Sequence, residues 1–176
     1  MGADVIGLQE VEAYWERSGN IRQVERIAER LGGYHAVFGA AVDIHKSLDG
    51  RPVRRQFGNA ILSRWPLLTT PTFLFPKLGP TNSHSIQRGL TEATIDTPIG
   101  LIRVYTSHFS HLYDEERMEH ARFTLDVHRR WVVEGPVSSS HHQDTSWLEE
   151  PIGLKICMPI APCADQRHQA RRRRCR

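Results

Sequence analysis

Residues 3–11 read ADVIGLQEV, in which an apolar run up to Leu8 is followed by a polar pair, Gln9 and Glu10. Both faces of the run are apolar as far as Leu8, which predicts a buried β-strand over residues 3–9. Such a strand brings Glu10 to the rim of a sheet. A single carboxylate at a strand end is a ligand that Mg²⁺ accepts, although a solvated acid is the simpler interpretation of Glu10 taken alone.

A second strand that ends in a polar group is predicted over residues 101–108, which read LIRVYTSH. It brings His108 to a sheet rim, where an imidazole can act as a general acid or base or donate to a phosphate oxygen. A strand-end histidine with a local hydrogen bond is the simpler interpretation of His108 taken alone. His111 is a weaker candidate, because only its spacing from His108 supports it.

Two further polar residues lie between these strands. Asn59 stands near the start of an apolar strand in the segment FGNAILSR, residues 57–64. Arg88, in the segment QRGL of residues 87–90, carries a planar fork of donors that fits a phosphate. Each one alone is more simply a turn residue or a surface charge, so the interest lies in their order along the chain.

Two helices are predicted. The first begins at Asn20, a favoured N-cap that forms a capping-box pattern with Gln23, and ends at Gly32-Gly33. Its inner face is predicted from apolar residues at helical spacing: Val24, Ile27, Ala28 and Leu31. The second helix is predicted from Asp114 to about Val133. Its expected inner face consists of Met118, Ala121, Leu125 and Val132.

The pattern between residues 34 and 108 is that of strands. They are predicted over residues 34–42, 57–63, 67–75, 88–96 and 101–108. The polar stretch Ile44 to Arg55, with Gly50 and Pro52, is predicted to be an excursion loop between the first two. Thr97-Pro98-Ile99-Gly100 predicts a hairpin turn between the last two.

Together, these segments resemble the metal-dependent endonuclease/exonuclease/phosphatase family, which includes deoxyribonucleases and sphingomyelinases. The resemblance rests on four segments in the same order: DVIGLQEV at residues 4–11, FGNAILSR at 57–64, Arg88 with the strand after it, and VYTSH at 104–108. It covers about residues 3–133. The implied fold class is α/β (α+β): a partial four-layered α/β sandwich with two mostly antiparallel sheets flanked by helices.

The resemblance also implies roles for the polar residues. Glu10 is expected to bind Mg²⁺ (or Mn²⁺), and His108 to be a catalytic histidine at the phosphate. Arg88 and Asn59 are expected to bind the substrate. The implied reaction is hydrolysis of a phosphodiester or phosphomonoester by attack of water, with a metal stabilising the charge on phosphate. Nucleic acid, a lipid headgroup and an inositol phosphate all remain open as substrates.

The sequence departs from the family pattern in three places. It has no strand with an Asn ahead of residue 3, no Gly-Asp-x-Asn, and no closing Asp-His. The family uses the second and third of these to orient water, bind phosphate and complete the metal site. One carboxylate and one histidine leave the attacking water without an assigned base. The chain is therefore expected to be a truncated member with impaired activity.

The formal net charge of +3 comes from the C-terminal end of the chain. Residues 151–176 carry seven basic residues and one acidic residue, whereas the first 150 carry 16 basic and 19 acidic residues. We therefore expect a partial domain, residues 1–135, and an irregular, disordered, basic tail, residues 136–176, which holds all three cysteines.

The tail leaves one alternative function open. A non-catalytic remnant would bind nucleic acid or an acidic partner through the arginine run of the tail. No stretch of the sequence is long and apolar enough for a membrane span, and no secretory signal is visible. A cytoplasmic location is expected by default.

Overall fold

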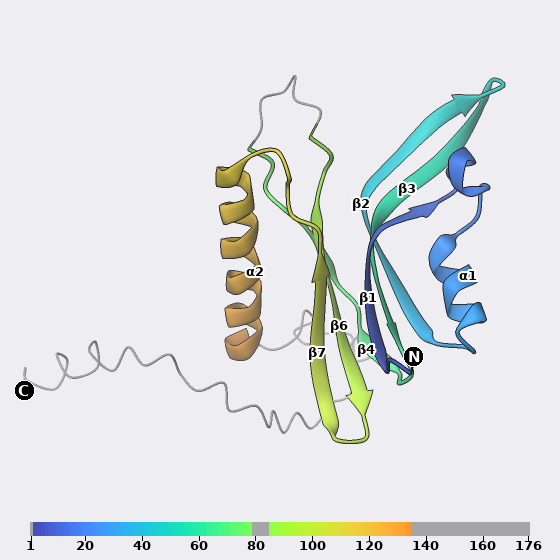
Figure 1. Cartoon of the computed structure of the whole chain (residues 1–176). Coiled ribbons are helices and arrows are strands. Elements are labelled where there is room, and N and C mark those ends of the chain that lie inside the picture. The colour runs from blue at the N-terminus through green and yellow to red at the C-terminus, as the bar shows by residue number, and fades with distance from the viewer. Residues whose placement is uncertain (1, 79–84, 135–176) are drawn as a thin grey trace, which may run out of the picture.

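Two antiparallel sheets pack face to face, and each carries one helix on its outer face, so the domain has four layers (Figure 1). The computed structural model describes residues 2–78 and 85–134. The predicted α/β sandwich with two mostly antiparallel sheets and flanking helices is confirmed. The predicted tail, residues 136–176, lies outside the described residues.

The elements follow one another in a simple order. They are β1 (Val5–Ala13), the short 3₁₀ helix η1 (Glu16–Ser18), α1 (Gln23–Arg30), β2 (His35–Leu48), β3 (Arg51–Ser63), β4 (Leu67–Thr69), β5 (Thr72–Leu74), β6 (Gly89–Thr97), β7 (Gly100–Ser107) and α2 (Asp114–Glu134). The first sheet has the order β1-β3-β2. In the second sheet, β6 pairs with β4 and β5 and also with β7.

The second half of β3, the middle strand of the first sheet, is buried on both faces over residues 58–63. Ala60 and Leu62 point to the outer face, where they pack with Val24 and Ala28 of α1. Ile61 points the other way and packs with residues of β6 in the second sheet. Side chains alternate across a strand, so a continuous apolar run fits a strand covered on both sides.

The second sheet is covered on its outer face by α2 (Figure 1). Val127 packs there with Phe75 and Leu90, and aromatic rings surround this group. An ion pair between Glu92 and Arg103 lies in the same layer, with only 2% and 8% of the two side chains exposed. The outer layer is therefore held by apolar contacts together with buried polar groups.

The predicted strand over residues 67–75 is divided in two. Pro71 lies between β4 and β5, and it has no N–H to donate to a neighbouring strand. The predicted hairpin after β6 is confirmed, because Thr97 pairs directly with Gly100 across a two-residue turn. The φ angle of Gly100 is 116°, a conformation that glycine adopts without strain.

The first strand lies at an edge, which corrects the prediction of a buried strand over residues 3–9. Among the described strands, β1 pairs only with β3, and only its last three residues are buried. A run that is apolar on both faces indicates that other layers pack above and below the sheet. It does not indicate whether the strand is hydrogen-bonded to one neighbouring strand or to two.

The prediction of an excursion loop over Ile44 to Arg55 is wrong. β2 and β3 continue as a paired ribbon through this stretch, from Ile44 opposite Arg55 to Leu48 opposite Arg51. Asp49 and Gly50 form the turn, with φ angles of 48° and 76°. Positive φ at both central residues is the geometry of a tight hairpin turn, and Asp-Gly favours it.

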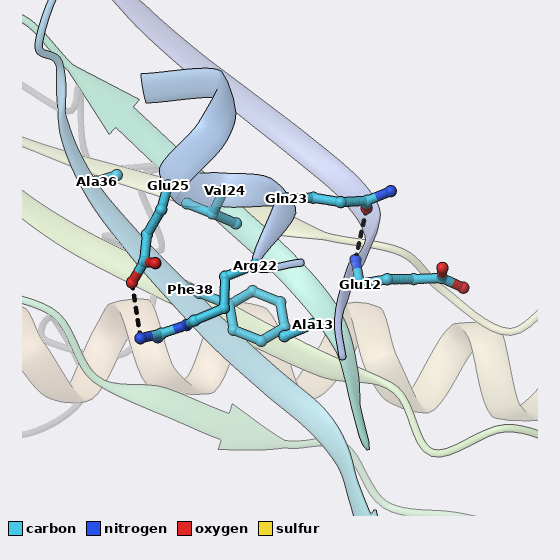
Figure 2. A pocket seen from close by; sticks show the side chains of 8 residues that line it. All are labelled: Glu12, Ala13, Arg22, Gln23, Val24, Glu25, Ala36 and Phe38. Carbon is cyan, nitrogen blue, oxygen red and sulfur yellow. Dashed lines mark hydrogen bonds and ion pairs between the residues drawn. The ribbon is translucent and has the colours of Figure 1, made fainter. Parts of the chain in front are cut away.

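The helix α1 begins later than expected, and the predicted capping box is absent. The N-cap residue is Arg22, without a side-chain cap, and Asn20 has a left-handed backbone instead. Gln23 turns away from the helix and accepts a hydrogen bond from the backbone N–H of Glu12 at 2.8 Å (Figure 2). The predicted end is correct, because Gly33 N–H bonds back to the carbonyl of Ala28.

The helix α2 has nearly the predicted bounds but turns the opposite face to the sheet. Three of the four residues expected on its inner face are more than half exposed: Met118, Leu125 and Val132. The buried face is carried by Glu116, His120, Val127 and Trp131. His120 hydrogen-bonds to the carbonyl of Pro76, shortly after β5, and Val127 packs with Phe75 and Leu90. These contacts decide the orientation of the helix. Among the described residues, no helix is long and apolar enough to cross a membrane.

Candidate functional site

A β-bulge shapes the end of β1 around Glu10. Leu8 pairs with Ala60 and Val11 with Gly58, so two residues of β1 stand opposite Asn59 alone. Glu10, one of the two, has a φ of 56°, a left-handed conformation that is uncommon for residues other than glycine. Bulges of this kind redirect a side chain and are frequent beside active sites.

A hydrogen bond joins the two sheets next to this bulge. Gln9 Nε2 donates to Thr106 Oγ1 at 2.9 Å, which connects β1 of the first sheet to β7 of the second. Gly7 leaves room for this approach, because a Cβ at its position would make a tight contact with Thr106 Oγ1 at 3.3 Å. The residues that follow Gln9 and Thr106 on the two strands are thereby brought together.

Glu10, Arg88 and His108 meet at the rim between the two sheets. His108 Nδ1 lies 3.2 Å from Glu10 Oε1, and Arg88 Nη1 lies 3.6 Å from the same oxygen. Arg88 Nη1 is also 3.0 Å from His108 Nδ1. Arg88 is buried, whereas the Glu10 carboxylate is 54% exposed. The group therefore has a fixed cation at its base and an acid that faces solvent.

The proton on His108 cannot satisfy both neighbours at once. Arg88 Nη1 can only donate, so that contact requires an unprotonated Nδ1 on His108. Glu10 Oε1 accepts, so the contact with it requires a proton on the same nitrogen. A ligand oxygen that accepted from Arg88 would remove this conflict.

Asn59 and His111 complete the surroundings of Arg88. Asn59 Nδ2 donates to the carbonyl of Gly89 at 3.0 Å, so this buried amide holds the start of β6 beside Arg88. His111 Nδ1 lies 3.5 Å from Arg88 Nη2. Asn59, Arg88 and His108 also line one small pocket. All four residues predicted from the sequence lie in one place, together with the weaker candidate His111.

Gln9 and Thr106 are the residues that sequence reasoning missed here. Both stood within the quoted motifs, directly before Glu10 and two residues before His108. Their pairing could not be inferred because it joins strands of different sheets that are 97 residues apart in sequence.

The described residues offer one carboxylate for a metal at this rim. Within residues 2–78 and 85–134, no cluster of three or more His, Cys, Asp or Glu side chains is arranged to hold a metal ion. Mg²⁺ needs less from the protein, since it keeps several waters and often takes one or two carboxylates together with substrate phosphates. The exposed Glu10 carboxylate fits that minimal requirement.

The surface beside Glu10 is open. A groove runs between β1 and α1, and its lining includes Glu10 together with Arg26 and Arg30. It is separate from the small pocket at the start of α1 in Figure 2, which has Gln23 and Phe38 in its wall and leaves Glu10 out. The groove therefore reaches Glu10 from the side of α1, and Arg88 and His108 are not part of its lining.

Comparison with known proteins identifies relatives of this chain. Residues 1–154 match the sequence profile of the family described as the Endonuclease/Exonuclease/phosphatase family. A solved endonuclease/exonuclease/phosphatase from Beutenbergia cavernae DSM 12333 is 27% identical, with a TM-score of 0.57, and the match covers 70% of this chain and 34% of that one.

A second solved structure has a lower similarity. It is an endonuclease/exonuclease/phosphatase family protein from Leptotrichia buccalis C-1013-b, 18% identical with a TM-score of 0.49, and the match covers 70% of this chain and 48% of that one. No match was found among the curated proteins. The chain thus spans about a third to a half of the length of these two solved structures.

Proposed function

Because this chain belongs to the endonuclease/exonuclease/phosphatase family, we propose that it carries the metal-binding and phosphate-binding part of a phosphoester hydrolase. The observation that carries the proposal is the meeting of Glu10, Arg88 and His108, which come from two different sheets. An acid, a fixed cation and an imidazole within about one hydrogen-bond length of each other are suited to a phosphate and its counter-ion.

Arg88 is the phosphate-binding group in this proposal. Its guanidinium is buried to 7% exposure, and Asn59 fixes the backbone that follows it through Gly89. A guanidinium is always charged and can donate two parallel hydrogen bonds to phosphate oxygens. Because it is already held in place, little side-chain entropy is lost when the phosphate binds.

Glu10 is the proposed ligand of Mg²⁺ or Mn²⁺. The bulge turns its carboxylate toward the rim, where water and substrate oxygens can supply the remaining ligands. A bound ion would supply stabilisation of negative charge on the phosphate and on the leaving oxygen. Glu10 would at the same time be screened from the neighbouring phosphate, which it would otherwise repel.

His108 is proposed to hold a proton against a phosphate oxygen. Once that oxygen accepts from Arg88, Nδ1 of His108 is released to donate to Glu10. The ring would then be oriented by Glu10 and, with a proton on each nitrogen, would donate from its other nitrogen to the ligand. In this role His108 stabilises charge and does not need to activate water.

The base for the attacking water is not assigned to any of these residues. Gly-Asp-x-Asn and Asp-His, which the family uses for that step, do not occur in the sequence. We therefore propose that this chain binds a phosphate with a divalent ion but hydrolyses phosphoesters slowly. Nucleic acid is one substrate class that this chemistry allows.

Manganese binding tests the proposal even if hydrolysis is slow. Mn²⁺ broadens the amide signals of nearby residues in a ¹H–¹⁵N spectrum, and we expect broadening around Glu10 and His108. Glu10→Gln should abolish it. Glu25→Gln removes an acid of similar exposure on α1 and should leave it unchanged.

Hydrolysis of bis(p-nitrophenyl) phosphate supplies the second measurement. Any turnover should require Mg²⁺ or Mn²⁺ and should disappear in Glu10→Gln. Turnover that persists with chelator, or Mn²⁺ broadening that is unaffected by Glu10→Gln, would rule out Glu10 as the metal ligand.

A further inference from the structure

His120 in α2 is buried to 1% exposure and has two polar partners. The backbone N–H of Ser110 donates to Nδ1 at 3.3 Å, so this nitrogen carries no proton. Nε2 lies 3.1 Å from the carbonyl oxygen of Pro76, which can only accept, so Nε2 carries the proton of the ring. The two contacts together require a neutral His120 with its proton on Nε2.

Aromatic contacts hold the ring in that position. His120 stacks on Phe75 with 4.4 Å between the ring centroids and 13° between the ring planes. Phe109 meets the same ring edge-on at 5.7 Å. The ring is therefore fixed in rotation as well as in place, and its two nitrogens keep pointing at Ser110 and Pro76.

The first of its two bonds acts on the loop that carries both histidines of the site. Ser110 lies between His108 and His111, and it is buried. Its N–H is taken by His120, and its carbonyl accepts from Arg117 Nη1 at 3.3 Å. The peptide groups next to Ser110 are thus held on both sides by α2.

The second bond acts on the segment that carries Arg88. Pro76 follows Phe75, whose backbone N–H donates to the carbonyl of Arg88 at 3.0 Å. Gln87 Nε2 closes the same region by donating to the carbonyls of Phe75 and Arg88 at 2.8 and 2.9 Å. His120 therefore connects, through one ring, the backbone around Arg88 and the backbone around His108.

We propose that His120 is a positioning residue for the phosphate pocket, defined here as Arg88 with His108 and His111 beside it, and that it sets the separation of Arg88 from the two histidines without touching the ligand. What the pocket binds rests on the proposed function above. The geometry of His120 itself does not depend on it.

The protonation state of His120 fits this role. Burial lowers its pKa, and Arg88 acts in the same direction, while the bond to Pro76 and the charge of Glu116 oppose them. A proton added at Nδ1 would point at the N–H of Ser110, so protonation would break the bond that holds the loop.

The test compares two substitutions on the same helix. His120→Phe keeps an aromatic ring for the stack on Phe75 and removes both hydrogen bonds. His128→Phe is the control, because His128 is also on α2 and lies beside Tyr105, away from the pocket. Inorganic phosphate is titrated into each protein, and the ring ¹H–¹⁵N signals of His108 and His111 are followed.

We expect phosphate to shift both histidine signals in the unsubstituted chain. His120→Phe should weaken that binding about fivefold or more, which the loss of one ordinary hydrogen bond produces, and His128→Phe should not. Equal affinity in His120→Phe and the unsubstituted chain would overturn the positioning role. If phosphate shifts neither signal in the unsubstituted chain, the proposed phosphate pocket fails instead.

Two further measurements decide the inference if His120→Phe does not fold or phosphate does not bind. The ¹⁵N shifts of His120 should show a neutral ring with its proton on Nε2, and a proton on Nδ1 at neutral pH would contradict it. His120→Asn retains an acceptor near Nδ1. It should leave the ring signals of His108 closer to those of the unsubstituted chain than His120→Leu does, and equal displacement in both would also contradict it.

Discussion

Glu10 combines a left-handed backbone with a carboxylate that faces the guanidinium of Arg88 and the imidazole of His108. A left-handed conformation costs an L-residue about 1–2 kcal/mol relative to a right-handed one. Backbone strain of this kind persists where the surroundings impose it, and it is concentrated at functional sites. The bulge at Glu10 therefore indicates that the direction of this side chain is maintained at the expense of stability.

Replacing Glu10 separates the strain from the carboxylate. We expect Glu10→Gly to be more stable than Glu10→Ala by about 1 kcal/mol, because only glycine adopts the left-handed conformation freely. Urea unfolding of the two variants measures the difference. Both should lose Mn²⁺ broadening at the rim. Equal stability of the two variants would show that the bulge is not strained.

The hydrogen bond between Gln9 and Thr106 is a second single-residue feature that positions the candidate site. Thr106→Val keeps the shape of the side chain and removes the acceptor for Gln9 Nε2. We expect a loss of about 1 kcal/mol in the free energy of unfolding. Because the bond aligns Glu10 with His108, Mn²⁺ broadening should also weaken.

Thr69→Val is the matched control for that substitution. Thr69 also bonds through its hydroxyl, to Thr94, within the second sheet and away from Glu10. It should lose a similar amount of stability and keep the broadening. If Thr69→Val and Thr106→Val affect Mn²⁺ binding alike, the cross-sheet bond has no special role at the rim.

At the scale of elements, local patterns predicted the existence of both helices but not the face that α2 buries. Apolar spacing pointed to Met118, Leu125 and Val132, whereas the sheet receives Glu116, His120 and Val127. Residues 118 and 120 lie about 200° apart on a helix, so the two faces are nearly opposite. Polar residues take the inner positions because backbone groups are there to pair with them: Ser110 N–H and the Pro76 carbonyl for His120, and Leu78 N–H for Glu116.

A matched pair of truncations on α2 tests that orientation. Val127 is 4% exposed and packs with Phe75 and Leu90, whereas Leu125 is 53% exposed. We expect Val127→Ala to lower the free energy of unfolding by about 2 kcal/mol and Leu125→Ala to change it by less than about 0.5 kcal/mol. Thermal or urea unfolding measures both. A larger loss in Leu125→Ala than in Val127→Ala would show that the apolar stripe that includes Leu125 packs against the sheet.

The ribbon of β2 and β3 shows a different limit of local reasoning. Its outer part is mostly polar, with Ile44, Leu48 and Val53 scattered among polar and charged residues, so the regular alternation that identifies a half-buried strand is missing. The turn could still have been found, because Asp49-Gly50 is a strong hairpin signal. Gly50 and Pro52 favoured a loop only because each was interpreted as a breaker by itself.

At the scale of the whole molecule, the candidate site belongs to the contact between the sheets. Glu10, Asn59, Arg88 and His108 were predicted because the segments that hold them follow one another as in the endonuclease/exonuclease/phosphatase family. The match to the family's sequence profile confirms that family. The distances between these four residues depend on bonds between layers, such as Gln9 with Thr106 and Asn59 with Gly89. A sequence pattern records which strands exist, but contacts between strands of different sheets arise only when the sheets pack.

The stability of the whole domain should depend on pH through one buried group in particular. His120 is buried neutral, and its pKa is lowered by that burial, whereas a histidine in the unfolded chain titrates near 6.5. Between these two pKa values the unfolded chain binds a proton that the folded chain does not. The free energy of unfolding therefore falls as the pH decreases below about 6.5, and it is fully retained above that value.

His120→Phe isolates this contribution, because every other titrating group is shared. We expect the unsubstituted chain to lose more stability than His120→Phe between pH 7 and pH 5, since the variant has no proton to take up at that position. Urea unfolding at pH 7, 6 and 5 gives the slope of the free energy of unfolding against pH for each protein. Equal slopes for the two proteins would mean that His120 titrates alike in the folded and unfolded chains. That result would require water at the ring. The contact of α2 with Phe75, Ser110 and Pro76 would then not hold the backbone at Arg88 and the backbone at His108 together.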